Sequence, residues 1–260
     1  MAENQSDRLH EDRARALAFG GVAALYDHAR PSYPPALIDA LMELSPQRVL
    51  DVGCGTGKAA RLLVERGCDV LGVEPDPSMA AIARSHGITV EEATFENWEA
   101  QDRGFDLIVS GQAWHWVDPE RGVAKAGSLL RPGGHLGVFW NRGRPDEDAA
   151  RAFDAVYTRL APELAKTNIA LNPPVEPRAR IAEFENGGVF TEVAARAFAW
   201  ETVYDRAGWI GFVATHSDHV RLPDPQRHAL LDALGDAVDS LGGAMTYHYS
   251  TVLVLATRGV

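Results

Sequence analysis

The chain has 260 residues, of which 46% are hydrophobic and 23% charged, and its formal net charge is −11. Such a length and composition predict a soluble globular protein with a substantial core. The acidic balance argues against a nucleic-acid substrate, because phosphate binding needs clustered lysine and arginine. The two cysteines, Cys54 and Cys68, offer no disulfide framework and predict a reducing, cytoplasmic location. Residues 1–15 are charged throughout and show no apolar run that resembles a signal peptide, and no stretch approaches the roughly 20 apolar residues of a membrane span.

Two helical patterns, over residues 13–29 and 36–44, precede the main motif and are separated by prolines. Tyr26, Arg30 and Tyr33 surround these prolines, and a generic linker has no need of two tyrosines and an arginine. The group predicts part of a binding site. A surface turn with stacked aromatics is the alternative.

A strand pattern over residues 49–52 leads into a turn with Gly53, Gly55 and Gly57, and an apolar helical pattern follows. Glycines let the backbone approach a ligand closely and adopt φ values that a side chain forbids. The first N–H groups of the helix have no partner within the helix and face the turn. Strand, glycine turn and helix together predict the first half of a nucleotide-binding α/β unit.

The spacing of this turn excludes two common ligand families. A dinucleotide site, G-x-G-x-x-G, would need glycine where Lys58 stands, and a P-loop would need serine or threonine where Ala59 stands. Residues 51–57 instead read D-x-G-x-G-x-G. A tight turn without a ligand is the less favoured alternative, because three glycines and Asp51 coincide.

Glu74 ends a second predicted strand over residues 69–74, and Asp76 begins the next helix. An acid in this place can accept hydrogen bonds from both hydroxyls of a ribose. A third strand is predicted over residues 88–92, and a turn with Thr94 and Phe95 follows it.

Two further strands are predicted over residues 105–111 and 135–140, with a helix between them. Strands alternating with helices predict an α/β, doubly wound, mostly parallel sheet with a ligand crevice at the carboxyl ends of the strands. Beyond residue 141 the pattern changes to helices and two late alternating strands, over 196–204 and 245–257. We expect these two strands to form an antiparallel pair that closes the sheet.

Several motifs in this order and spacing resemble the class I (Rossmann-like) S-adenosylmethionine-dependent methyltransferases. They are the glycine motif, Glu74, Thr94-Phe95, Gln112-Ala113-Trp114-His115-Trp116 and Leu130-Arg131-Pro132-Gly133-Gly134. The segment Tyr26-Asp27-x-x-Arg30-Pro31-x-Tyr33-Pro34 and the pair Trp140-Asn141 are similar to a small-molecule branch related to trans-aconitate methyltransferase. The resemblance implies a seven-stranded sheet with a C-terminal antiparallel hairpin and a helical lid.

The resemblance also implies one methyltransferase domain over residues 1–260 that binds S-adenosylmethionine. Residues 1–35 would form lid helices, 36–141 the cofactor-binding core, and 142–260 further lid helices and the closing strands. The glycines would approach the methionine part of the cofactor, Glu74 the ribose, and Thr94 and Phe95 the adenine. The full set of expected cofactor residues is Asp51, Gly53, Cys54, Gly55, Gly57, Glu74, Pro75, Thr94, Phe95, Gln112, Ala113 and Trp114.

The function expected from these residues is in-line methyl transfer to a small molecule, on oxygen. His115 is the candidate base, with Tyr26 and Arg30 as further catalytic residues. A histidine packed between two tryptophans is the alternative for His115. A silent cofactor-binding module and an N-methyltransferase for a small amine are the alternative functions.

Selectivity is expected to come from a lid built from residues 19–35, 142–180 and 205–225. Arginines there suit carboxylate recognition, namely Arg30, Arg142, Arg144, Arg178 and Arg180. His216 and His219 have metal-like helical spacing, but without a third ligand we expect no metal. No membrane or nucleic-acid partner is expected, and the sequence makes no prediction of the oligomeric state.

Overall fold

Seven strands form one sheet in the order β3-β2-β1-β4-β5-β7-β6. The first five strands run parallel to one another, and β7 is antiparallel to both of its neighbours. The strands are β1 (Arg48–Val52), β2 (Asp69–Val73), β3 (Thr89–Glu91), β4 (Phe105–Gly111), β5 (Leu130–Pro145), β6 (Phe190–Asp205) and β7 (Ala244–Arg258). The predicted doubly wound, mostly parallel sheet with a C-terminal antiparallel hairpin is confirmed.

The computed structural model describes residues 10, 21, 23–165 and 177–259. Of the helix predicted over 13–29, the described part is α2 (Ala23–Ala29). Residues 1–9, 11–20 and 22 of the expected N-terminal lid lie outside the described residues. Residues 166–176 of the expected lid segment 142–180 also lie outside them.

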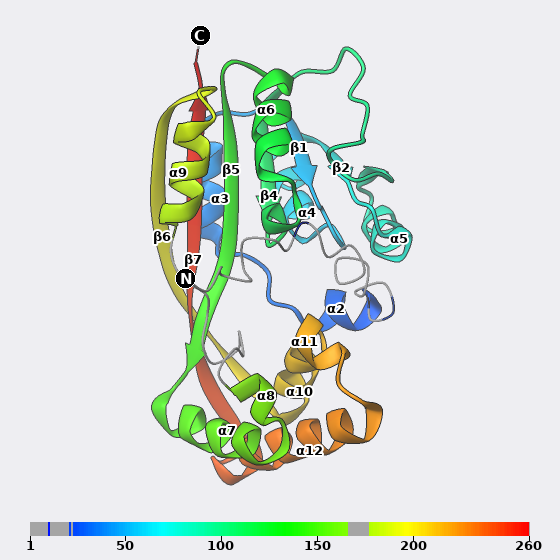
Figure 1. Cartoon of the computed structure of the whole chain (residues 1–260), viewed down its shortest axis with the longest axis vertical. Helices are drawn as coiled ribbons and strands as arrows, with labels where there is room; N and C mark the ends of the chain where they lie inside the picture. Colours follow the sequence, from blue (N-terminus) through cyan, green and yellow to red (C-terminus); the bar gives the residue numbers. More distant parts are fainter. Residues whose placement is uncertain (1–9, 11–20, 22, 166–176, 260) are drawn as a thin grey trace.

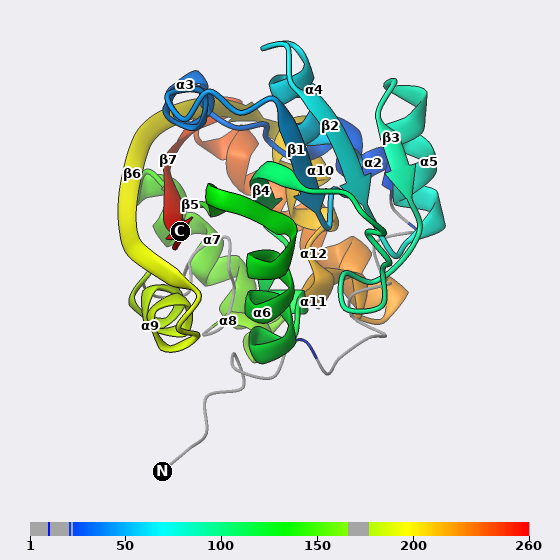
Figure 2. The same cartoon turned by 90° about the horizontal axis from the view of Figure 1, so that it is seen from above.

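Helices cover both faces of the sheet because each carries an apolar stripe that the sheet buries. On one face lie α3 (Pro35–Met42), α4 (Lys58–Val64) and α5 (Pro77–Ser85), packed through side chains such as Leu41 and Leu63. On the other face lie α6 (Pro119–Leu129) and α9 (Arg178–Asn186), whose Val123 and Phe184 pack in a separate core cluster on that side. Figure 2 shows the sheet between these two groups of helices.

The last three strands extend far beyond the rest of the sheet (Figure 1). The fifth strand was expected to end at Trp140, but β5 continues to Pro145 by pairing residues 141–145 with residues 247–251 of β7. The ring of Tyr247 occupies the space that a side chain on Gly143 would need. A Cβ on Gly143 would lie 2.3 Å from a ring carbon of Tyr247. Arg142 therefore lies on a strand.

A second helical layer surrounds the far ends of these strands (Figure 1). Its own core contains Phe153 stacked on Trp209 at 4.8 Å, together with Tyr204 and Tyr247 from β6 and β7. The helices are α7 (Glu147–Leu160), α8 (Pro162–Ala165), α10 (Arg206–Ala214), α11 (Ser217–Val220) and α12 (Asp224–Ser240). These helices, drawn at the lower end of the long strands in Figure 1, form the expected helical lid.

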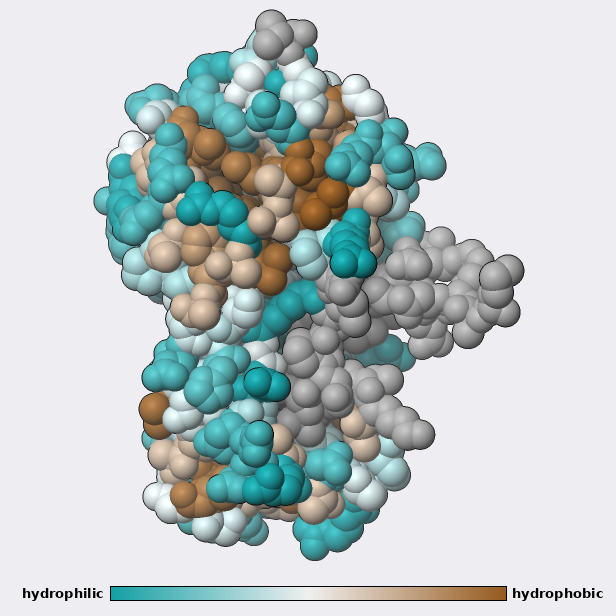
Figure 3. Space-filling model, turned by 90° about the vertical axis from the view of Figure 1, so that its left-hand side faces the viewer, coloured by the Kyte–Doolittle hydropathy of each residue, from teal (hydrophilic) through white to brown (hydrophobic). Residues whose placement is uncertain are grey.

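Within the described residues β6 is one of the two edge strands, paired only with β7. It exposes small apolar side chains such as Ala195 and Ala197, and Val203 is 65% exposed. Figure 3, which faces this side of the molecule, shows apolar surface in its upper part and a mostly hydrophilic lower part. Among the described helices, none is long and apolar enough to cross a membrane.

Candidate active site

A cavity of about 410 Å³ lies at the carboxyl ends of the parallel strands, between the sheet and the helical lid. Its wall combines the β1–α4 turn, the ends of β2, β4 and β5, and residues of α2, α10 and β7. Most of the site residues predicted from the sequence line it: Tyr26, Arg30, Asp51, Gly53, Cys54, Gly55, Glu74, Pro75, Thr94, Phe95, Gln112, Ala113 and His115. Gly57 and Trp114 are not among the lining residues.

The three glycines of the β1–α4 turn have positive φ angles but different surroundings. A Cβ on Gly53 would lie 2.5 Å from the Cβ of Ala113, whereas a Cβ on Gly55 would meet no atom within 4 Å. Gly55 therefore presents open space to the cavity. Gly57, the residue before α4, instead packs against Ala83 and Ile88, and its contact with the cofactor stays a prediction.

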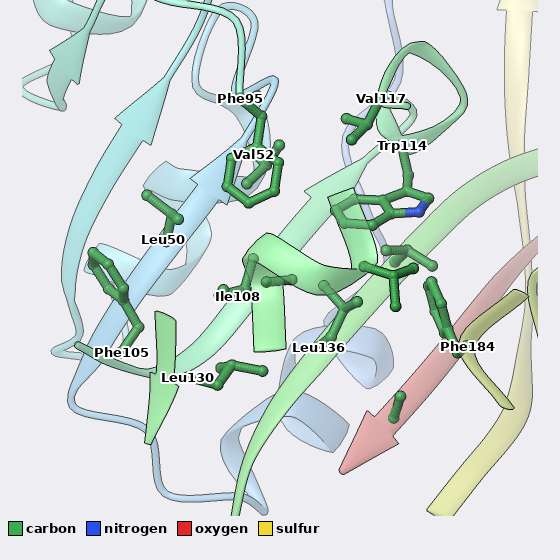
Figure 4. Close-up of a cluster of buried hydrophobic side chains, with 14 of the residues drawn as sticks. Leu50, Val52, Phe95, Phe105, Ile108, Trp114, Val117, Leu130, Leu136 and Phe184 are labelled. Atoms are coloured by element: carbon green, nitrogen blue, oxygen red, sulfur yellow. The ribbon is translucent and has the colours of Figure 1, made fainter. Parts of the chain in front are cut away.

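Trp114 was predicted to contact the cofactor, and the structure corrects this for its side chain. The indole is fully buried, donates a hydrogen bond to Glu183 Oε1 at 3.0 Å and packs against Phe184. Figure 4 shows it among the side chains of this core cluster. The short 3₁₀ turn over Trp114–Trp116 sends Trp114 into the core and leaves His115 and Trp116 in the cavity wall.

Two buried acids, Asp51 and Glu74, lie at the ends of β1 and β2. Glu74 accepts hydrogen bonds from the backbone N–H groups of Gly55 and Asp76, at 2.9 and 3.0 Å. Neither carboxylate oxygen of Asp51 has a partner among the described residues. Burial, with the charge of Glu74 added, raises the pKa of Asp51 to about 7. Burial likewise raises the pKa of Glu74 to about 7, so this end of the cavity favours a ligand that carries positive charge.

Arg30, on α2, is held in a fixed orientation at the lid side of the cavity. Its Nε donates to Thr215 Oγ1 at 2.7 Å and its Nη2 to the Thr215 carbonyl at 3.0 Å. The guanidinium also lies over the rings of Tyr26 and Phe212, 5.2 and 5.3 Å from their centroids. These contacts leave Nη1 without a described partner, so the charge of Arg30 remains available to a ligand.

Arg142 is a second arginine in the cavity wall, half-buried on the extension of β5. Its guanidinium forms no hydrogen bond or ion pair with any residue that the structure describes. Burial lowers its pKa, and no neighbouring acid offsets that effect. Of the other arginines predicted for the lid, Arg180 lines the cavity but is paired with Glu183, and Arg144 and Arg178 do not line it.

His115 lies in the cavity wall and also packs against tryptophan, so features of both sequence interpretations are present. The indole N–H of Trp140 donates to His115 Nδ1 at 3.3 Å, and the Trp116 ring lies 4.8 Å away. An Nδ1 that accepts a hydrogen bond carries no proton.

The sequence did not single out several lid residues that line the cavity. They are Phe212, Tyr247 and Tyr249, and Lys58 at the start of α4 also lines it. His216, considered in the sequence for its metal-like spacing with His219, lines the cavity as well. The alternation of the last strand did place Tyr247 and Tyr249 on one face. Only the fold shows that this face lies toward the β1–α4 turn, across the cavity. No group of three or more His, Cys, Asp or Glu side chains in the described part of the chain is arranged to hold a metal ion.

Comparison with known proteins agrees with this architecture. Residues 49–134 match a family model described as a methyltransferase domain. An uncharacterised methyltransferase of Mycobacterium tuberculosis is 33% identical over 253 residues, covering 94% of this chain and 97% of that protein. The trans-aconitate 2-methyltransferase of Mycolicibacterium gilvum is 30% identical over 213 residues, covering 76% and 80%.

Solved structures show the same fold. A putative type II methyltransferase from Anaeromyxobacter dehalogenans has a TM-score of 0.64 at 25% identity, covering 88% of this chain and 97% of that one. The phosphoethanolamine N-methyltransferase 2 of Haemonchus contortus, in complex with S-adenosylmethionine, has a TM-score of 0.53 at 15% identity, covering all of this chain and 61% of that one.

The residues of the cavity fit this cofactor. S-adenosylmethionine carries a positive sulfonium and ammonium group together with ribose hydroxyls, and the cavity offers the unpartnered carboxylate of Asp51 and the unpartnered hydroxyl of Thr94. Gly55 leaves the space that a close approach to the backbone requires. With a relative 33% identical along nearly the whole chain, the protein belongs to the class I S-adenosylmethionine-dependent methyltransferases.

Proposed function

We propose that this methyltransferase transfers the methyl group of S-adenosylmethionine to a carboxylate oxygen of a small organic acid. The observation that carries the proposal is Arg142, a half-buried cation in the cavity wall with no acid paired to it among the described residues. An arginine desolvated in this way is stabilised by a bound anion, and its planar fork matches a carboxylate. Arg30, fixed by Thr215, adds a second positive charge.

The chain's own residues would hold the cofactor at the strand ends. The turn at Gly53 and Gly55 would contact its methionine part, and Glu74 would bind the ribose. Glu74 has capacity for this, because a carboxylate accepts up to about four hydrogen bonds and only two are used by backbone N–H groups. Gln112, held at φ +59° with its amide donating to the Asn141 carbonyl, would lie beside the sulfonium. The cofactor supplies a methyl group already activated by positive sulfur.

Cofactor binding is expected to release protons at pH 7, because Asp51 and Glu74 both have pKa values of about 7 there. The positive cofactor favours their ionised forms and lowers these pKa values, so affinity should fall as the pH drops below 7. Calorimetry in phosphate and in Tris buffer should give different binding enthalpies at pH 7, since the two buffers take up protons with different heats. Equal enthalpies in both buffers at pH 7 would contradict the assignment.

A carboxylate acceptor also removes the need for the base that the sequence suggested. A carboxylic acid is ionised at neutral pH, so its oxygen attacks the methyl group without losing a proton. His115, whose Nδ1 accepts the indole N–H of Trp140, is then not required to act as a base. Under this proposal His115 is part of the wall around the acid, and in-line alignment within the cavity contributes the rate enhancement.

A small amine, the alternative acceptor, is less compatible with this cavity. An ammonium group would meet the positive charges of Arg30 and Arg142, and it would have to lose a proton before attack. The name of one relative, trans-aconitate 2-methyltransferase, also refers to an acid as acceptor. These points favour oxygen over nitrogen.

A screen of candidate acceptors tests the proposal. The enzyme would be incubated with S-adenosylmethionine and panels of small carboxylic acids, phenols, thiols and amines, with formation of S-adenosylhomocysteine as the readout. Turnover with acids, and products that alkali hydrolyses as it does methyl esters, are expected. Turnover with amines alone would overturn the proposal. The cytoplasmic location and the absence of a nucleic-acid partner stay predictions.

A further inference from the structure

His216 is a buried histidine that the proposed reaction does not yet use. It lies between α10 and α11, is 3% exposed and lines the cavity beside Phe212, whose ring meets the imidazole edge-on at 4.6 Å. The Arg30 guanidinium lies over the face of the Phe212 ring. His216 therefore belongs to the lid end of the cavity, where an acceptor and not the cofactor is expected.

The hydrogen bonding of His216 fixes its tautomer. Its Nδ1 lies 3.3 Å from the carbonyl oxygen of Val213, and because a carbonyl can only accept, Nδ1 must carry the proton. Burial, followed by the charges of Arg30 and His219, lowers the pKa of His216 well below its usual range, so the ring is neutral. Nε2 consequently has a lone pair, and no described residue donates a hydrogen bond to it.

The neighbouring histidine cannot supply the missing partner. His219 lies 5.8 Å from His216 between ring centroids, but both of its ring nitrogens are already engaged. Nδ1 of His219 is bound to Asp218 at 2.7 Å and Nε2 to the hydroxyl of Tyr157 at 2.8 Å. Because His216 lines the cavity, a ligand bound there can supply the donor that its Nε2 lacks among the described residues.

We propose that His216 is a specificity-determining residue whose Nε2 accepts a hydrogen bond from a hydroxyl group of the acceptor. The substrate would then be a small hydroxy acid, with its anionic group at Arg142 and a hydroxyl at His216. This rests on the proposed function for the anionic group. A hydroxyl is favoured over an amine because the fixed charge of Arg30 stands beside the same end of the cavity and repels an ammonium group.

The tautomer gives a first test that needs no substrate. Nitrogen-15 spectra of histidine-labelled enzyme, loaded with S-adenosylhomocysteine at pH 7, should show one neutral ring protonated at Nδ1. Its signal is identified by its loss in His216→Phe. Val213 retains a partner in this variant, because its carbonyl also accepts from the backbone N–H of His216 at 3.0 Å. A charged ring, or a ring protonated at Nε2, would overturn the proposal.

Matched acids give the second test. Malate and succinate, lactate and propionate, and 3-hydroxybenzoate and benzoate would be titrated into the same loaded enzyme by calorimetry. In at least one pair the hydroxylated acid should bind about 10-fold more tightly to the wild type, as one well-made hydrogen bond allows. His216→Phe should abolish that preference. Tyr157→Phe, which removes a buried hydrogen bond of the neighbouring pair without altering a residue of the cavity wall, should retain it.

The outcomes separate this proposal from the one on which it rests. If acids bind and need Arg142, but hydroxyl groups add nothing or the preference survives in His216→Phe, only the role of His216 fails. In the latter case a bound water or another wall residue receives the hydroxyl. If no acid of any pair binds the wild type, the carboxylate assignment fails and the hydroxy-acid assignment fails with it.

Discussion

Replacing Gly55 with leucine is expected to abolish binding of S-adenosylmethionine, with a loss of affinity on the order of 100-fold or more. Gly55 lines the cavity, and a Cβ built on it meets no atom within 4 Å. The Cβ would therefore stand in open space, and the rest of the leucine side chain would extend into the cavity where the cofactor is expected. Isothermal calorimetry with S-adenosylmethionine and with S-adenosylhomocysteine measures the loss directly.

Gly87→Leu is the matched control for backbone strain. Gly87 also has a positive φ, +83° against +56° for Gly55, and its Cβ would also meet nothing within 4 Å, but it does not line the cavity. Both variants should lose a similar amount of stability, about 1–2 kcal/mol, while only Gly55→Leu loses the cofactor. Wild-type affinity in Gly55→Leu, or equal loss in Gly87→Leu, would contradict the position assigned to the cofactor.

The parallel half of the sheet could be predicted because its signals are local. The fourth strand was expected over residues 105–111, which is the extent of β4. Asp76 was expected to begin a helix, and its carboxylate accepts hydrogen bonds from the N–H groups of Ser78 and Met79. In such segments the pattern of apolar residues and the capping side chain lie within a few positions of each other, so no distant contact is needed to interpret them.

The extension of β5 could not be predicted because its cause is distant in the sequence. Residues 141–145 read Asn-Arg-Gly-Arg-Pro, a polar run with glycine and proline that favours a loop. They form a strand because residues 247–251, about a hundred positions later, supply the pairing partner, and the Tyr247 hydroxyl donates to the Gly143 carbonyl at 2.8 Å. Tertiary pairing outweighs local propensity here.

The directions of the side chains that follow β4 could not be predicted from the sequence either. Trp114, His115 and Trp116 are consecutive aromatic or heteroaromatic residues, and composition alone assigns all three to a pocket wall. A single 3₁₀ turn decides that Trp114 enters the core beside Phe184 while the other two line the cavity. Which of the five lid arginines would face the cavity was undecidable for the same reason, since Arg142 and Arg144 differ by only two positions on one strand.

Replacing Arg142 with glutamine is expected to raise KM for an acid acceptor by about 10- to 100-fold, the value of a charge-assisted hydrogen bond in a partly buried site. The affinity for S-adenosylmethionine should stay unchanged, because Arg142 is not among the residues proposed to hold the cofactor. Glutamine keeps a polar side chain of similar reach and removes only the positive charge. Steady-state kinetics with the best acid from the screen, together with calorimetry on the cofactor, separates the two effects.

Arg144→Gln is the matched control, since it makes the same chemical change on the same strand at an exposed position that does not line the cavity. It should leave KM for the acid within about twofold of the wild type, because exposed charges at a distance are screened by salt. If both variants raise KM equally, the effect comes from the general field of the lid and not from a contact with Arg142. If neither does, the acid is bound elsewhere, and the carboxylate proposal loses the observation that carries it. A rise confined to Arg142→Gln would assign the anion site to the point where the extended β5 meets the cofactor cavity.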